Sequence, residues 1–324
     1  MPRQPPYCMT STNEDRDMRN VLTLFDLSTA EIERIFEISS ELKAKLQKGQ
    51  REALLPGRMV AMLFEKPSLR TRVSFETAIR HLGGGAMFLG DDVGWGKRES
   101  AKDFGQVISQ YVDVIVCRAK SHQKVEELAQ YCTCSVINGL TDLYHPCQAL
   151  ADLFTVREIH GNLAGRRIAY VGDANNVARS LALACGKLNM AFSIASPDGY
   201  TFDQDFLQRL SREVPRLDLT QVTNPVDAVK NADAVYTDVW ASMGQEAEQA
   251  KRQEAFADYQ VNEALMAQAP SHAVFLHCLP ARRGEEVSDA VIDGDQSAIV
   301  QQAGNRLHAQ KGLLAFLLDA DVSG

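Results

Sequence analysis

The sequence predicts an α/β fold of two doubly wound parallel-sheet domains, with the active site in the cleft between them. Short apolar runs alternate with amphipathic helical patterns, as they do in parallel sheets that are covered on both faces. A glycine-containing break at residues 161–165 separates two such series. Polar side chains gather where the apolar runs end, and open α/β sheets bind ligands beyond those ends.

The first series begins with a helix, because Ser28 and Glu31 form a capping box and apolar residues follow at helical spacing until Gly49. Strands are expected at residues 59–64, 86–89, 112–117 and 135–138. Helices are expected at residues 71–82, 101–111, 123–131 and from 146 to about 159. Three glycines at 83–85 predict the end of the helix at residues 71–82 rather than a phosphate loop.

The second series predicts a further sheet. Strands are expected at residues 167–171, 191–195, 234–237 and 273–276, and helices at 177–188, from about 202, and at about 305–318. We therefore expect one domain at residues 1–150, with residues 1–19 as a loose tail, and a second at residues 151–324. The last helix is expected to pack back on the first domain.

Composition limits the classes of function. The net charge of −8 argues against a nucleic-acid-binding surface, and no apolar run approaches the roughly 20 residues of a membrane span. Seven cysteines without a paired C-x-x-C pattern argue against a disulfide framework or structural zinc. The first 17 residues lack the apolar core of a signal peptide. We expect a cytoplasmic protein without nucleic-acid or membrane partners.

The segment Ser68-Leu69-Arg70-Thr71-Arg72 follows an apolar strand and precedes a helix. Free backbone N–H groups and the positive helix end favour an anion there, and arginine suits the oxygens of a phosphate. The alternative is that both arginines are solvated residues of a first helical turn. Two arginines flanked by two hydroxyls favour a phosphate site for a small molecule.

Arg118 follows another predicted strand, and His145 and Gln148 lie at the start of the helix from residue 146. A His and a Gln three residues apart share one helix face and could bind a polarised carbonyl group. A capped helix start is the alternative. A metal half-site is disfavoured because the nearest other histidines, His122 and His160, lack ligand spacing.

His277 and Cys278 follow a predicted strand of the second series. Adjacent strand residues point to opposite faces, so His277 is not expected to activate Cys278 as a nucleophile. The alternatives are a buried strand end or a non-covalent role for Cys278 in the cleft.

Two further strand ends carry residues suited to an amino acid. Asn176 could be a helix cap or could hold a carboxylate or amino group, and Ala174 and Val177 break the glycine spacing that a dinucleotide requires. Asp238 could cap a helix or bind an ammonium group with Ser242 beside it. An NAD enzyme is therefore disfavoured.

These segments, in this order and spacing, resemble the aspartate/ornithine carbamoyltransferase superfamily over about residues 20–318. Residues 64–72 resemble its carbamoyl phosphate signature, and residues 145–148 and 277–280 resemble two further motifs. Asp238 with residues 242–244 is similar to the loop that closes over ornithine in the ornithine branch. Leu69 departs from the usual threonine, Ala174 from a frequent glycine, and Arg282 and Arg283 lie in a variable stretch.

The resemblance implies roles for individual residues. Carbamoyl phosphate would be held by Ser68, Leu69, Arg70, Thr71, Arg118, His145, Gln148, Cys278, Leu279 and Arg306. Ornithine would be held by Asn176, Asp238, Ser242 and Met243. The catalytic residues would be Arg70, Arg118, His145, Asp238 and Cys278.

The implied reaction converts carbamoyl phosphate and L-ornithine to L-citrulline and phosphate, in arginine metabolism, by attack of the neutral δ-amine on the carbamoyl carbon. The resemblance also implies a homotrimer or a multiple of trimers, with active sites at subunit boundaries and neither metal nor organic cofactor. Two alternatives stay open: a carbamoyltransferase for another amine, such as putrescine or an acylated ornithine, and a non-catalytic carbamoyl phosphate or amino-acid-binding protein.

Overall fold

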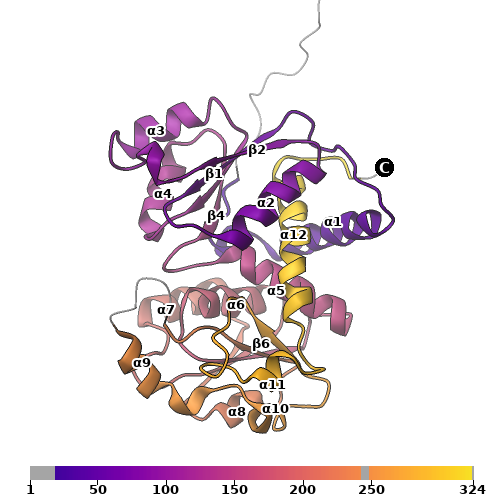
Figure 1. Cartoon of the computed structure of the whole chain (residues 1–324), viewed down its shortest axis with the longest axis vertical. Coiled ribbons are helices and arrows are strands. Elements are labelled where there is room, and N and C mark those ends of the chain that lie inside the picture. The colour runs from indigo at the N-terminus through magenta and orange to yellow at the C-terminus, as the bar shows by residue number, and fades with distance from the viewer. Residues whose placement is uncertain (1–18, 242–247, 323–324) are drawn as a thin grey trace, which may run out of the picture.

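The computed structural model describes residues 19–241 and 248–322, and within them it contains two parallel β-sheets. Figure 1 shows the first sheet in the upper half of the molecule and the second in the lower half, with helices α5 and α12 between them. Every strand pair in both sheets is parallel. The predicted fold class of two parallel-sheet units is confirmed.

The first sheet has the strand order β2-β1-β3-β4. Its strands are β1 (Met59–Phe64), β2 (Gly85–Leu89), β3 (Val114–Arg118) and β4 (Ser135–Leu140). Its helices are α1 (Thr29–Gln47), α2 (Leu69–His81), α3 (Ala101–Ile108) and α4 (His122–Tyr131). Alternate residues of β1 enter different cores: Val60 and Met62 pack on the side of α1 and α2, and Ala61 and Leu63 on the side of α3 and α4.

The second sheet has the strand order β7-β6-β5-β8-β9. Its strands are β5 (Arg167–Val171), β6 (Ala191–Ala195), β7 (Asp218–Val222), β8 (Ala234–Thr237) and β9 (Val274–His277). The helices among them are α6 (Asn176–Lys187), α7 (Gln204–Glu213), α8 (Pro225–Val229), α9 (Gln249–Ala255), α10 (Glu263–Met266) and α11 (Asp289–Ile292). Ile168 and Tyr170 face α6, and Ala169 and Val171 face the core beside α8, α10 and α11.

Two long helices connect the sheets. Helix α5 (Pro146–His160) follows β4 and leads to β5, and it crosses the expected boundary at residue 150 without a break. Helix α12 (Ile299–Leu317) follows the second sheet and packs against α1, α5 and α2. The largest apolar core contains residues of both sheets together with α5 and α12. These two helices therefore fix the position of one sheet relative to the other.

Each sheet has one point from which successive strands are added in opposite directions. This point lies between β1 and β3 in the first sheet and between β5 and β8 in the second. Ligands of doubly wound sheets bind at such switch points, beyond the carboxyl ends of the strands. The polar segments identified in the sequence follow these strands. Among the described helices, none is long and apolar enough to cross a membrane.

Candidate active site

A cleft of about 1200 Å³ lies between the two sheets. It is lined by segments that follow β1, β3 and β4 on one side and β5, β8 and β9 on the other, together with α12. Of the residues predicted for the site, the cleft lining includes Ser68, Leu69, Arg70, Thr71, Arg118, His145, Gln148, Asn176, Asp238, Cys278, Leu279 and Arg306. Ser242 and Met243 lie outside the described residues.

The N-terminus of α2 opens into the cleft. Ser68 is its N-cap, and the Ser68 hydroxyl accepts a hydrogen bond from the Thr71 N–H at 3.4 Å. Leu69 is the first helical residue and 75% of its surface is exposed, so its side chain contributes little packing. Arg70 lines the cleft and forms no ion pair among the described residues. These features give an open cationic helix end, which suits an anion.

Arg72 does not join this helix end. Its guanidinium lies 4.1 Å from the centre of the Phe88 ring and pairs with Glu76 at 3.5 Å. The expectation that both arginines of the motif face a phosphate is therefore wrong for Arg72. Residues two apart on a helix point in different directions. Arg72 therefore lies against Phe88 of β2, whereas Arg70 lines the cleft.

Three nitrogen atoms in the cleft wall are buried without a hydrogen-bond partner: Nε of Arg118, Nε of Arg306 and Nδ1 of His145. Burial lowers the pKa of Arg118 to about 10, with a further contribution from the charge of Arg306. Burial, followed by the charges of Arg306 and Arg118, lowers the pKa of His145 well below its usual value. The His145 imidazole is thus neutral at pH 7, and this wall presents two buried guanidinium groups to a ligand.

Arg306 is held from two directions. Its Nη2 donates to the Thr71 hydroxyl at 3.0 Å, and its Nη1 donates to Oε1 of Gln148 at 2.7 Å. All three side chains are buried. Arg306 was assigned to the site through the family resemblance alone, and the fold brings it to the helix end that carries Ser68.

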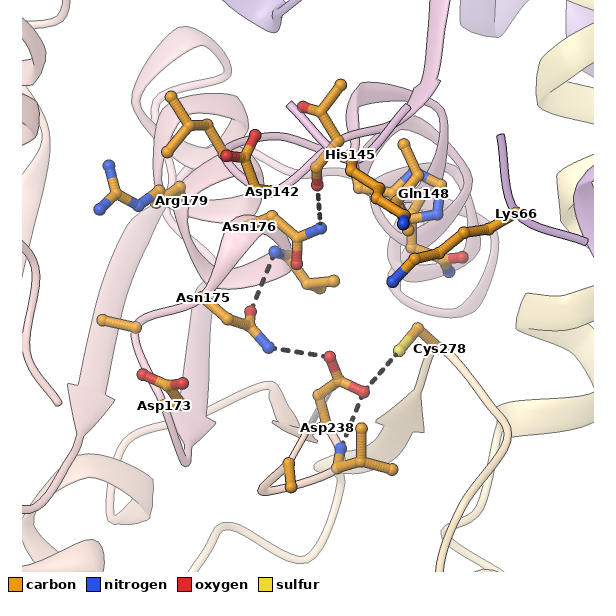
Figure 2. A pocket seen from close by; sticks show the side chains of 18 of the residues that line it. Lys66, Asp142, His145, Gln148, Asp173, Asn175, Asn176, Arg179, Asp238 and Cys278 are labelled. Atoms are coloured by element: carbon orange, nitrogen blue, oxygen red, sulfur yellow. Dashed lines mark hydrogen bonds between the residues drawn. The ribbon is translucent and has the colours of Figure 1, made fainter. Parts of the chain in front are cut away.

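The opposite wall contains a hydrogen-bonded carboxylate. Asp238 accepts from the Val239 N–H at 2.8 Å, from Nδ2 of Asn175 at 2.9 Å and from the Cys278 thiol at 3.0 Å. Figure 2 shows Asn175, Asp238 and Cys278 joined in this order across the lower side of the pocket. Burial, with the neighbouring carboxylate of Asp238, raises the pKa of the Cys278 thiol well above its usual value. Cys278 is therefore a thiol donor rather than a thiolate.

Asn175, and not Asn176, is the N-cap of α6. The Asn175 side-chain oxygen accepts from the N–H groups of Val177 at 2.9 Å and Ala178 at 3.1 Å. Asn176 is the first helical residue, and its side-chain amide donates to the carbonyl of Thr141 at 2.6 Å. The cap interpretation of Asn176 is thus wrong, and its side-chain oxygen is directed toward the cleft (Figure 2).

His277 points away from the cleft, as its place beside Cys278 on a strand predicts. Its Nε2 lies 3.1 Å from Oε1 of Glu286, and its Nδ1 accepts from the Leu279 N–H at 2.8 Å. The Leu279 N–H is therefore occupied, and its carbonyl oxygen is the backbone group that remains for a ligand. Asp238, His277 and Cys278 are the one group of potential metal ligands among the described residues, but both His277 nitrogens are already engaged. These residues fit a hydrogen-bonded support for the cleft better than a metal site.

Sequence reasoning assigned no role to several residues that line the cleft, including Asp142, Asn175, Asp173 and Arg179 (Figure 2). Asn175 could have been found, since asparagine is a preferred N-cap and Val177 begins the apolar pattern of the helix. Asp173 pairs with Arg252 at 2.7 Å, and Arg179 pairs with Asp203. Their partners lie 79 and 24 positions away, so no local pattern indicates these pairs.

Comparison with known proteins gives two adjoining family matches. Residues 19–158 match the aspartate/ornithine carbamoyltransferase carbamoyl-P binding domain, and residues 164–317 match the Asp/Orn binding domain of the same family. The two matches are separated by residues 159–163, at the end of α5.

Among curated proteins, the chain is 53% identical over 303 residues to the ornithine carbamoyltransferase of Anoxybacillus flavithermus, covering 93% of this chain and 96% of the relative. It is 50% identical over 303 residues to that of Halalkalibacterium halodurans, covering 93% and 95%. Among solved structures, the ornithine carbamoyltransferase of Pyrococcus furiosus superposes with a TM-score of 0.89 at 46% identity, covering 92% of this chain and 96% of that one. The Thermus thermophilus enzyme superposes with a TM-score of 0.83 at 37% identity, covering 92% and 98%.

Proposed function

This chain belongs to the aspartate/ornithine carbamoyltransferase family and catalyses ornithine carbamoyl transfer, and we propose that the transfer proceeds by direct attack of the neutral δ-amine of ornithine on the carbamoyl carbon. The reaction converts carbamoyl phosphate and L-ornithine to citrulline and phosphate, a step of arginine metabolism. The observation that carries the mechanism is the division of the cleft into a cationic wall and a wall with a hydrogen-bonded carboxylate.

Carbamoyl phosphate binds at the cationic wall. Its phosphate group contacts Arg70, the hydroxyls of Ser68 and Thr71, and the N–H of Leu69 at the N-terminus of α2. This assignment is supported by the absence of an ion pair for Arg70 among the described residues and by the N-terminus of α2, which opens into the cleft. The same groups neutralise the phosphate as it leaves.

The carbamoyl group lies between Arg118, His145 and Gln148. Arg118 and the neutral imidazole of His145 stabilise the charge that develops on the carbonyl oxygen, a role that the buried Nε and Nδ1 atoms without partners support. The Leu279 carbonyl and Oε1 of Gln148 accept from the carbamoyl NH₂ group. Arg306 holds Gln148 and Thr71 in place, at 2.7 Å and 3.0 Å.

Ornithine binds at the opposite wall. Asp238 and Asn176 hold its α-amino and carboxylate groups, with Ser242 and Met243 completing the site. The Cys278 thiol, whose sulfur lies 3.0 Å from Oδ1 of Asp238, orients the δ-amine end of the ornithine side chain. An amine of this kind has a pKa of about 10, so loss of water around the bound amine must favour its neutral form.

The chemical step forms one bond and breaks one. The amine lone pair forms the new C–N bond, the C–O bond to phosphate breaks, and the phosphate leaves with that electron pair. The amine proton passes to the leaving phosphate. No electron is transferred and no enzyme group is acylated, so the proposal includes no organic cofactor, no metal and no covalent intermediate.

The enzyme acts as a homotrimer, or a multiple of trimers, in the cytoplasm. Leu69 and Val73 support an assembly, because they lie one helical turn apart on α2 and are 75% and 50% exposed. The six described cysteines are free, as suits a reducing compartment. Light scattering of the purified protein measures the assembly, and a monomer with full activity would contradict active sites at subunit boundaries.

The decisive experiment is a citrulline assay with carbamoyl phosphate and a panel of amines. L-Ornithine should be turned over, and putrescine and N-acetylornithine should react at least about a hundredfold more slowly, because Asp238 and Asn176 would lack a free α-amino and carboxylate pair. A protein that binds carbamoyl phosphate but forms no citrulline would be a binding protein instead.

A further inference from the structure

A buried carboxylate lies directly behind the cationic wall of the cleft. Asp152 is fully buried in α5, one helical turn after Gln148. Its Oδ1 accepts from Nε2 of Gln148 at 2.7 Å and from Nε2 of Gln302 at 2.6 Å. Its Oδ2 accepts from the Tyr236 hydroxyl at 3.1 Å. Asp152 lies outside the cleft lining and reaches the proposed carbamoyl phosphate site through its hydrogen bond with Gln148.

All three neighbours donate hydrogen bonds to Asp152. A carboxylate is an acceptor at both oxygens, so it satisfies the three donors at once. An amide or a protonated acid at this position would present a donor to one of them. The contacts therefore favour the charged form of Asp152, and they fix which way the Gln148 amide points.

That orientation determines what Gln148 presents to the cleft. With Nε2 donating to Asp152, Oε1 of Gln148 faces Arg306 and accepts from Nη1 at 2.7 Å. If the Gln148 amide were reversed, its NH₂ group would face Nη1 of Arg306, and two donors would oppose each other. The charge of Asp152 also acts on Arg306, whose burial lowers the pKa of its guanidinium.

The same carboxylate links α5 to the second sheet and to α12. Tyr236 lies on β8, and Gln302 on α12 accepts at its Oε1 from the His277 N–H at 2.9 Å, at the end of β9. Asp152 is thus bonded to Gln148 on its own helix, to Tyr236 in the second sheet and to Gln302 on α12. Each of these side chains is buried.

We propose that Asp152 is a positioning residue of the transfer reaction, which holds the Gln148 amide and the Arg306 guanidinium in the arrangement that binds carbamoyl phosphate. The inference rests on the proposed function, since it assigns the effect of Asp152 to a site of that function. It predicts an effect on carbamoyl phosphate that exceeds the effect on ornithine.

The pKa of the Asp152 carboxyl group lies within the pH range of an activity assay, so the pH dependence of the kinetics provides a second measurement. Burial raises its pKa to about 7, against the lowering effect of its hydrogen bonds to Gln302, Gln148 and Tyr236. The titratable groups that interact with it are Arg306 from α12, Tyr236 from β8 and Cys278 after β9. As the pH falls below about 7, protonation of Asp152 should release the Gln148 amide and raise KM for carbamoyl phosphate.

The experiment compares steady-state kinetics of the full-length enzyme and Asp152→Asn between about pH 6 and 9. The variant should raise KM for carbamoyl phosphate about ten- to a hundredfold, as expected when a buried bond to a charged group is lost. KM for ornithine should change less than about threefold. The rise of KM below pH 7 should be absent from the variant, while the titration of carbamoyl phosphate itself affects both proteins equally.

Thr155→Val is the matched control. Thr155 is also buried in α5 and bonded to α12, since its hydroxyl accepts from Nδ2 of Asn305 at 2.9 Å, but it does not contact Gln148. This variant should leave KM for carbamoyl phosphate within about twofold. If Asp152→Asn behaves like Thr155→Val, or lowers kcat without a preference for either substrate, the role of Asp152 is structural and the proposal is wrong.

Tyr236→Phe keeps the proposal testable if Asp152→Asn does not fold. It removes one donor that favours the charged carboxylate, so the pKa of Asp152 should rise and the pH at which KM increases should move upward. An unchanged pH dependence would overturn the proposal. A wild-type enzyme that forms no citrulline would instead overturn the proposed function, so the two failures are distinguishable.

Discussion

Arg306 donates a hydrogen bond from Nη2 to the hydroxyl of Thr71 at 3.0 Å, although 235 positions separate the two residues in the chain. Thr71 lies in the first turn of α2, beside the first sheet, and Arg306 lies in α12, which follows the second sheet. One guanidinium therefore ties the phosphate motif to the helix that connects the two halves of the molecule.

Arg306→Lys should lower kcat/KM for carbamoyl phosphate about a hundredfold. A lysine ammonium group cannot hold Thr71 and Gln148 in the fixed geometry of a guanidinium fork. Steady-state kinetics measure the effect. Arg212→Lys is the control, because Arg212 is 72% exposed and should be neutral. A loss below about threefold for Arg306→Lys would contradict a bidentate role.

Arg70→Ala should abolish measurable turnover and leave the unfolding temperature nearly unchanged. Arg70 forms no ion pair among the described residues, so its removal breaks no described salt bridge, while the phosphate loses its main cation. Citrulline formation and thermal unfolding measure the two effects.

Arg72→Ala is the matched control for Arg70→Ala. Arg72 stacks on Phe88 and pairs with Glu76 outside the cleft, so its loss should reduce stability slightly and keep most of the activity. Equal loss of activity in both variants would show that the division of roles between the two arginines is wrong.

Leu69→Thr should change kcat/KM by less than about threefold. The Leu69 side chain is 75% exposed, and the group proposed to bind phosphate at this position is the backbone N–H. Isothermal titration with inorganic phosphate, together with kinetics, measures the effect. A gain of tenfold or more in phosphate affinity would mean that a threonine hydroxyl at this position binds the ligand directly.

The strands were the most predictable part of the fold. Strands β1, β5, β6 and β8 begin and end at the predicted residues, because each is a continuous apolar run in a buried parallel sheet. Strand β7 was missed because it is an edge strand that pairs only with β6 and carries polar Asp218, Thr220 and Gln221. Helices α8, α9, α10 and α11 were missed because they are too short to show a helical period.

The cleft residues at strand ends were predictable because the carboxyl ends of parallel strands share one edge of the sheet. Arg306 required the family resemblance, since it lies within a helix that begins at Ile299, six residues earlier than about 305. Asp152 had no signal at all, because its partners Tyr236 and Gln302 lie 84 and 150 positions away. Long-range polar contacts of this kind follow from the packing of helices between the sheets, not from a local pattern.

Catalytic rate at saturating carbamoyl phosphate should rise with pH between about 6 and 9, since the attacking amine must be neutral. Burial lowers the pKa of His145 well below its usual value, so this imidazole stays neutral throughout the interval and adds no inflection. Burial lowers the pKa of Arg118 to about 10, so its guanidinium remains charged over the same range. A flat profile would contradict amine deprotonation as the pH-sensitive event.

Cys278→Ala should lower kcat about ten- to a hundredfold but leave measurable turnover, because the proposed role of the thiol is to orient the amine rather than to attack. The Cys278 thiol donates to Asp238 at 3.0 Å, and burial together with that carboxylate raises its pKa well above the usual value. A thiolate is the reactive form of cysteine, so alkylation of Cys278 by iodoacetamide at pH 8 should also be slow.

Cys185→Ala is the control, since Cys185 is buried in α6 away from the cleft lining. Complete loss of activity in Cys278→Ala, combined with rapid alkylation of the wild-type thiol, would favour a covalent carbamoyl-cysteine. Retained turnover with slow alkylation would exclude a carbamoyl-cysteine intermediate, and it is the result expected for direct transfer to the amine.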